Sequence, residues 1–198
     1  AVISPGMADV LQSRGVPAEK ISVVPNWAEE SSFRPVPRNE ELSAQLGIDR
    51  EFTIMYAGNL GEMQNLDAFL DAASILRNRN DIGFVLVGAG VRGNALAERV
   101  TKERLDNVTF VGPQPFDKMA DILALADVQL ISLKDDPLYR ITMPSKVQAN
   151  MAAGLPIIAA VAGDAARVVE DADCGRSVAP GDANALASTI SELADMNP

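Results

Sequence analysis

A lysine at the predicted start of a helix is the side chain with the clearest potential for chemistry. It stands in Pro144-Ser145-Lys146, after an apolar run that ends at Ser132 and a loop over 133–144. This order predicts that Lys146 lies at the carboxyl edge of a parallel sheet, where open α/β folds bind ligands. A cation there opposes the helix dipole and is unfavourable unless an anion accompanies it. The pattern indicates a phosphate-type site, where Ser145 either caps the helix or contacts the phosphate; a solvated surface lysine is the alternative.

A second anion-binding candidate is the glycine-containing turn AGNLGEMQN at 57–65. Gly58 and Gly61 remove side chains where a ligand could approach, and free amides at the next helix start could face an anion. An ordinary strand-to-helix loop has the same composition, so the turn taken alone leaves both interpretations open.

The sequence GAGVRG at 88–93 matches the G-x-G-x-x-G pattern of dinucleotide-binding folds. It follows the second strand of the predicted sheet rather than the first. No acidic residue stands about 20 positions further on, near Phe110, to bind a ribose hydroxyl. We therefore interpret it as a tight turn whose glycines serve packing, with a nicotinamide or flavin site as the alternative.

Several chemistries are excluded or disfavoured by residue type. The chain contains no histidine, which removes His-based nucleophile systems, His general bases and His zinc sites. Asp135-Asp136 and the pair Asp171 and Asp173 are the acidic candidates for a metal. Adjacent side chains diverge and acids at a helix end are commonly solvated, so we expect no metal and no cofactor. A single cysteine, Cys174, fits a reducing cytoplasm.

Alternating apolar runs and helical patterns must position these residues. The runs cover 52–57, 84–87, 108–111, 128–132, 156–161 and 175–178. The helical segments between and after them cover 65–78, 93–104, 117–126, 145–153, 164–172 and 182–194. Continuous apolar strands belong to a parallel sheet that is covered on both faces. Six such units predict a doubly wound, Rossmann-like α/β domain over 49–198.

The first 50 residues have a different organisation. The segments 1–6, 8–15 and 21–27 predict a small β-α-β piece. A proline-rich stretch follows, so we expect a linker over 31–48 that contains a short helix at about 39–46. The opening lacks the basic start of a signal peptide and has the pattern of a strand entered within a longer protein. We therefore interpret residues 1–30 as the end of a preceding domain.

Charge and hydropathy limit the partners. The net charge is −10, which argues against unspecific nucleic-acid binding because no surface is available to neutralise phosphates. The most apolar stretch, 156–161, is far shorter than the roughly 20 residues of a membrane span. We expect a cytoplasmic protein with a small anionic ligand.

Seven motifs in order resemble one family. They are VVPNW, YAGNLGEMQNLDAFLDAA, FVLVGAG, VTFVGPQP, ADVQLISL, MPSKVQANMAAGLPIIAAVAGDAARVVEDADCG and APGDANALA. This order is similar to glycosyltransferase family 4, the retaining GT-B enzymes, and most similar to bacterial exopolysaccharide, O-antigen and colanic-acid members. The resemblance covers essentially the whole chain.

The resemblance implies a donor-binding C-terminal domain for a nucleoside-diphosphate sugar, most simply UDP-linked. It implies that a missing N-terminal domain binds a saccharide or lipid-linked acceptor, and that the parent associates peripherally with the inner membrane. The implied sites group by function. The diphosphate would contact Gly58, Asn59, Gly61, Ser145 and Lys146; the base and ribose would contact Val111, Gly112, Pro113 and Gln148; the donor sugar would lie at Arg140, Thr142, Met143 and Pro144. No metal is implied, because positive side chains and helix dipoles stabilise the departing diphosphate.

Some positions depart from the family pattern. Many members have an arginine and a lysine in the first glycine turn, where this chain has Asn59 and Gln64. Many also carry two glutamates eight apart, where it has Ile141 and Ala149. The usual ribose-binding carboxylate is therefore missing, with Gln148 as one substitute.

These departures leave other functions open. The alternatives are a GT-B epimerase or phosphorylase and a non-catalytic nucleotide-binding domain. With half of the cleft absent, we expect the chain alone to bind nucleotide weakly and to turn over little. An apolar face left uncovered could drive dimerisation.

Overall fold

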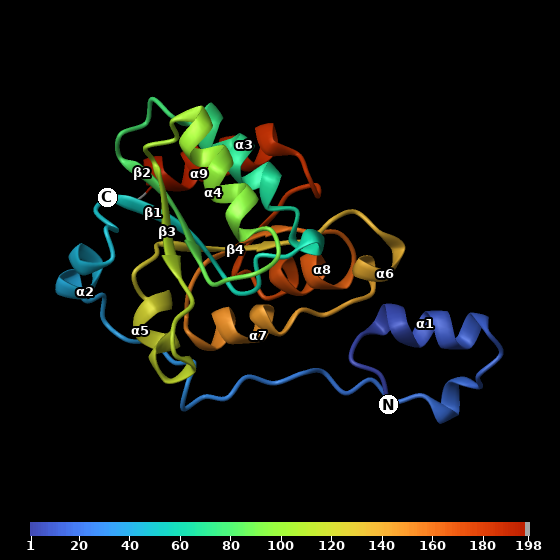
Figure 1. The fold of residues 1–198 in the computed structure, drawn as a ribbon. Helices are drawn as coiled ribbons and strands as arrows, with labels where there is room; N and C mark the ends of the chain where they lie inside the picture. Colours follow the sequence, from blue (N-terminus) through green and yellow to red (C-terminus); the bar gives the residue numbers. More distant parts are fainter. Residues whose placement is uncertain (197–198) are drawn as a thin grey trace.

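A six-stranded parallel sheet forms the centre of the molecule in the computed structural model, which describes residues 1–196 (Figure 1). The strands are β1 (Phe52–Ala57), β2 (Ile82–Val87), β3 (Val108–Gly112), β4 (Val128–Ser132), β5 (Ile157–Ala160) and β6 (Gly175–Ser177). Their order is β3-β2-β1-β4-β5-β6, and all neighbours pair in parallel. This confirms the predicted doubly wound α/β fold, and the order reverses direction between β1 and β4.

Helices cover both faces of the sheet. The longer ones are α1 (Pro5–Ser13), α3 (Leu66–Ile75), α4 (Gly93–Glu103), α7 (Ser145–Ala152), α8 (Asp164–Asp171) and α9 (Ala183–Met196); the shorter ones are α2 (Glu40–Gln45), α5 (Met119–Leu123), α6 (Pro137–Arg140), and the 3-10 turns Ala18–Lys20, Glu62–Gln64 and Phe116–Lys118. Helices α3, α4 and α9 pack with alternate residues of β1 and β2, such as Tyr56 and Phe84, on one face. Helices α5, α7 and α8 pack against the other face (Figure 1). Because alternate strand residues face opposite layers, both layers are apolar and the strands read as continuous apolar runs.

Several predicted boundaries were wrong. The second strand begins at Ile82 rather than at 84, because Gly83 interrupts the apolar run without leaving the sheet. The predicted helix over 117–126 is a 3-10 turn followed by the short α5. The predicted loop over 133–144 contains α6, which Asp136 caps by accepting a hydrogen bond from the Leu138 amide at 2.8 Å.

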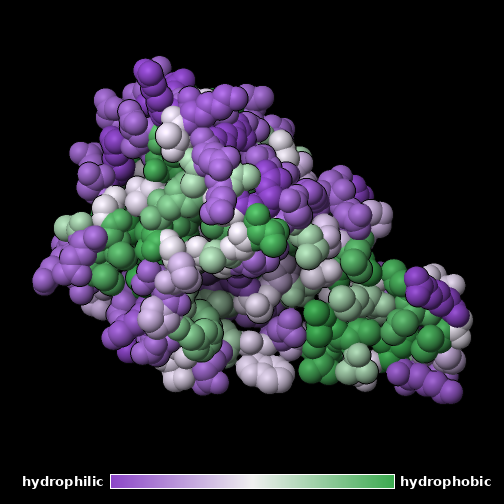
Figure 2. All heavy atoms as spheres, in the orientation of Figure 1, coloured by the Kyte–Doolittle hydropathy of each residue, from purple (hydrophilic) through white to green (hydrophobic). Residues whose placement is uncertain are grey.

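The N-terminal segment lies beside the sheet rather than in it (Figure 1). The two strands predicted at 1–6 and 21–27 shrink to a single parallel bridge between Val2 and Val23. The helix between them begins earlier than predicted, at Pro5, because the Ser4 side chain caps it. Figure 2 shows hydrophobic residues gathered on this segment, where Val23 and Val24 are exposed.

Two hydrogen bonds attach α1 to the rest of the molecule. The Ser4 hydroxyl donates to the Ile141 carbonyl at 2.6 Å, and the Gly6 amide donates to the Asp164 carboxylate at 2.7 Å. Asp164 is buried at the first turn of α8, so its charge lies near the positive ends of two helices. These contacts fix α1 beside the loop that leads into α7.

Candidate functional site

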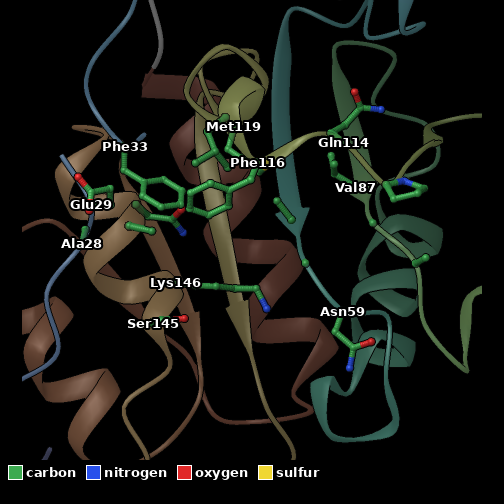
Figure 3. A pocket seen from close by; sticks show the side chains of 18 of the residues that line it. Ala28, Glu29, Phe33, Asn59, Val87, Gln114, Phe116, Met119, Ser145 and Lys146 are labelled. Carbon is green, nitrogen blue, oxygen red and sulfur yellow. The ribbon is translucent and has the colours of Figure 1, made fainter. Parts of the chain in front are cut away.

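A cavity of about 600 Å³ opens at the carboxyl edge of the sheet (Figure 3). It lies beyond the ends of β1 and β2 and against the first turns of α7, next to the point where the strand order reverses. Its lining comprises Trp27, Ala28, Glu29, Phe33, Ala57, Gly58, Asn59, Val87, Gly88, Ala89, Pro113, Gln114, Phe116, Met119, Leu123, Ser145, Lys146, Ala149 and Asn150. Ligands of open α/β sheets bind at such a position.

Lys146 is the cation of this cavity. Its side chain extends from the start of α7 toward the turn that carries Asn59 (Figure 3). Its ammonium donates a hydrogen bond to the Tyr56 hydroxyl at 2.9 Å and lies 4.6 Å from the centre of the Tyr56 ring. The Tyr56 hydroxyl in turn donates to the Asn59 carbonyl at 2.8 Å. These two consecutive hydrogen bonds, through the Tyr56 hydroxyl, therefore join α7 to the glycine turn after β1.

The electrostatics of Lys146 are those of a cation without a counterion. No carboxylate lies within 4.0 Å of its ammonium in the described part of the chain. Burial disfavours the charged form and lowers the pKa of Lys146 from 10.5 to about 8. The dipole of α7, whose N-terminus is adjacent, acts in the same direction. An anion bound here would restore the electrostatic balance.

Gly58 makes room for this lysine. Its φ of +143° is one that side-chain-bearing residues rarely adopt, and a Cβ there would collide with Cε of Lys146 and lie 2.6 Å from Nζ. The space that Gly58 leaves is thus occupied by the lysine stem. The sequence predicted that a ligand could approach in the space at Gly58, and the structure places the side chain of Lys146 there.

Gly61 is positioned differently from its predicted diphosphate role. It lies outside the cavity lining, and its amide donates to the Gln64 side chain at 3.1 Å. A Cβ at this position would stand 2.6 Å from Gln64 and 2.7 Å from Asn59. Gly61 therefore supports the turn, whereas Asn59 itself lines the cavity.

The opposite end of the cavity is apolar and aromatic (Figure 3). The rings of Phe33 and Phe116 meet edge to face, with centroids 5.4 Å apart and an interplanar angle of 85°. Met119 and Leu123 line the same end. A flat, weakly polar ligand group fits such a surface.

The predicted base-binding loop only partly reaches this cavity. Pro113 lines it, together with Gln114, whose side-chain amide donates to the Val111 carbonyl at 3.2 Å. Val111 and Gly112 lie outside the lining. Gln148 also lies outside it, and its buried Oε1 has no hydrogen-bond partner among residues 1–196.

The predicted donor-sugar loop borders the site without lining the cavity. Arg140 forms an ion pair with Asp135 at 2.8 Å near the surface. The Thr142 hydroxyl donates to the Leu138 carbonyl at 2.7 Å, and Met143 is buried in the core below α7. Pro144 is the N-cap residue of α7. This loop thus sets the start of α7, and only Ser145 and Lys146 of the segment reach the cavity.

The GAGVRG turn packs against the glycine turn of β1. A Cβ at Gly88 would collide with the backbone carbonyl of Gly58, and one at Gly90 would collide with that of Leu60. Arg92 forms ion pairs with Glu62 at 3.2 Å and Asp67 at 3.0 Å. These contacts agree with the packing interpretation for Gly88 and Gly90, whereas a Cβ at Gly93 would meet only Leu60 at 3.7 Å; Gly88 also lines the cavity.

Residues that the sequence did not reveal complete the cavity. Trp27 and Phe33 come from the extended segment after α1, Phe116 from a 3-10 turn, and Asn150 from the second turn of α7. The first three lie outside any periodic pattern, so only the folded chain brings them together. Among residues 1–196, no group of three or more Cys, Asp or Glu side chains could hold a metal ion, and no helix is long and apolar enough to cross a membrane.

Solved structures place the fold in one class. The chain superimposes on an Anabaena protein, Alr3699/HepE in complex with UDP, with a TM-score of 0.85 at 22% identity, over 99% of this chain and 54% of that one. It also matches the C-terminal domain of a group 1 glycosyl transferase family protein, LpcC of Francisella tularensis, with a TM-score of 0.68 at 18% identity, over 85% of this chain and 88% of that one. The fold is that of the C-terminal half of GT-B glycosyltransferases.

The family follows from sequence. The profile described as "Glycosyl transferases group 1" matches residues 51–196. The chain belongs to this glycosyltransferase family. It is 33% identical over 158 residues to a putative colanic acid biosynthesis glycosyl transferase, WcaI of Escherichia coli K12, covering 78% of this chain and 38% of that protein. It is 24% identical over 199 residues to the probable glycosyltransferase WbjE of Pseudomonas aeruginosa, covering 99% and 49%. The chain thus spans about half the length of these relatives or less.

Proposed function

We propose that the cavity binds the nucleoside diphosphate of a nucleotide sugar, with the diphosphate against Lys146. The observation that carries the proposal is a largely desolvated ammonium at a helix N-terminus without a carboxylate partner in the described chain. Such a cation is unfavourable in the free protein and becomes favourable when an anion binds. Ser145 and the first amides of α7 add donors for phosphate oxygens.

The two ends of the cavity orient the ligand in this proposal. The diphosphate lies at Lys146, and the base lies against Phe33 and Phe116 beside Pro113. A nucleotide has the same polarity, with charge at one end and a flat ring at the other. The solved Anabaena protein with the same fold was crystallised with UDP, which supports UDP as the first ligand to test.

For the longer protein, we propose a retaining transfer of the sugar to a saccharide or lipid-linked acceptor. The colanic-acid relative supports a role in polysaccharide biosynthesis. The acceptor would bind mainly in the half that the relatives have beyond this chain, with peripheral membrane association and a cytoplasmic location. Departure of the diphosphate would be stabilised by Lys146 and the α7 dipole, without a metal.

A second candidate is a non-catalytic nucleotide-binding domain. Ala149 favours it, because Ala149 lines the cavity at a position where many family members carry a glutamate. Glu29 is the single acidic side chain of the lining, so few carboxylates are available for catalysis. Sugar transfer by the longer protein would exclude this candidate, and nucleotide binding without any turnover would favour it.

The proposal is tested by isothermal titration of the chain with UDP, GDP and NAD, repeated on Lys146→Ala. We expect a nucleoside diphosphate to bind and the variant to lose roughly 10- to 100-fold in affinity, the range for hydrogen bonds to charged groups. Binding of NAD alone, unchanged by the substitution, would overturn the proposal and favour a site at the GAGVRG turn.

A further inference from the structure

A side-chain amide on α7 lines the cavity and has no hydrogen-bond partner in the described part of the chain. Asn150 is 4% exposed and belongs to the cavity lining. Its backbone carbonyl accepts from the Leu155 amide at 3.1 Å. Its side-chain amide makes no hydrogen bond within residues 1–196, and its polar atoms are not among the fully enclosed side-chain atoms, so they are open to the cavity. An amide that borders a cavity without a protein partner is satisfied by water in the free protein and is available to hydrogen-bond a ligand that displaces this water.

The position of Asn150 lies between the two ends of the site. It stands one helical turn after Lys146 on α7, so the two residues share a helix face and are separated by about 6 Å along the axis. At the end of the same helix, Ala153 packs in the apolar cluster that contains Leu123 and contacts Phe33. Along α7, Asn150 therefore lies between Lys146 and the aromatic end of the cavity.

We propose that Asn150 hydrogen-bonds the ribose hydroxyls of the bound nucleotide. The inference rests on the proposed function, because the ribose is the group that joins the diphosphate to the base. An amide offers one acceptor and two donors, and a pair of neighbouring hydroxyls can both donate and accept. Ala149, the adjacent lining residue, carries no polar group that would compete for these hydroxyls.

The consequence is that Asn150 selects ribonucleotides over deoxyribonucleotides. A site that hydrogen-bonds a ligand hydroxyl discriminates against the analogue that lacks it, because the buried polar group then stays unpaired. The amide carries no charge, so this selectivity is independent of pH, whereas the contribution of Lys146 changes with its protonation.

The experiment compares UDP, 2′-deoxy-UDP and 3′-deoxy-UDP by isothermal titration against the chain and Asn150→Ala. We expect the parent chain to bind UDP about 3- to 10-fold more tightly than at least one deoxy analogue. The affinity of Asn150→Ala for UDP should fall to the affinity that the parent chain has for that analogue. The affinity for the analogue itself should change little. Asn184→Ala, an exposed asparagine on α9, is the matched control and should preserve the discrimination.

Each result bears on the two proposals separately. If Asn150→Ala weakens UDP and both deoxy analogues equally, or if only Gln148→Ala removes the discrimination, the assignment of Asn150 is wrong while nucleotide binding stands. Circular dichroism of Asn150→Ala shows whether the variant is folded; if it is not, Asn150→Leu, which has a similar shape and no polar atom, replaces it with the same expected loss of discrimination. If UDP does not bind the parent chain, the proposed function fails and this inference fails with it.

Discussion

Replacing Lys146 by methionine should stabilise the free protein while it weakens anion binding. Burial lowers the pKa of Lys146 from 10.5 to about 8, and a difference of that size corresponds to roughly 3 kcal/mol of unfavourable free energy in the folded state at neutral pH. Methionine keeps most of the apolar stem above Gly58 and removes the charge. Loss of the hydrogen bond to Tyr56 and of the cation–π contact offsets about 1–2 kcal/mol of the stability gained by removing the charge.

The net expectation for Lys146→Met is a gain of about 1–2 kcal/mol at pH 7, which raises the melting temperature by roughly 2–8 °C for a chain of this size. The gain should shrink as the pH rises from 8 to 10.5. In that window the unfolded chain binds more protons than the folded one, so the parent chain gains stability and the variant does not.

Thermal and urea unfolding across pH 7 to 10 measure this effect, and UDP titration measures the binding. Lys134→Met is the control, because Lys134 is half exposed and its pairing with Glu62 at 3.7 Å is weak. A melting temperature of Lys146→Met at or below that of the parent at pH 7 would show that the buried ammonium is not under electrostatic strain. That result would refute the reasoning from which the anion site is inferred.

Three further predictions follow from the same geometry. The affinity for UDP should fall about 10-fold between pH 7 and pH 9, as Lys146 loses its proton near pH 8, and Lys146→Met should show no such fall; burial raises the pKa of Tyr56 well above its ordinary value, so Tyr56 does not titrate in this range. Gly58→Ala should cost about 1–3 kcal/mol of stability by urea unfolding and weaken UDP binding, because a Cβ at φ +143° is strained and displaces the lysine stem. Phe116→Ala should weaken UDP about 3- to 10-fold and leave pyrophosphate binding unchanged in competition titrations, because Phe116 contacts the base end alone.

The sheet could be predicted because its strands are buried on both faces. β1 and β4 matched the predicted runs residue for residue, since each is a mainly apolar run of β-forming residues that is buried along almost its whole length. The N-terminal strands could not be predicted correctly, because their apolar runs lack a sheet to join and form only the bridge at Val2. Apolar sequence indicates burial, but the number of strand partners depends on the tertiary structure.

The site was predictable where residues follow a strand end or begin a helix. Position alone located Gly58 and Lys146, because the carboxyl ends of parallel strands meet at one edge. Phe33 and Phe116 come from irregular segments and meet only in the folded chain. Gln148 was expected in the site, but the rotation of α7 brings Asn150 to the cavity lining instead.

A crystal structure of the chain with UDP tests the central claim most directly. We predict that a phosphate oxygen lies within hydrogen-bond distance of the Lys146 ammonium, with the uracil ring against Phe33 and Phe116. Density for UDP at the GAGVRG turn or on the surface, with Lys146 still bonded only to Tyr56, would contradict the account.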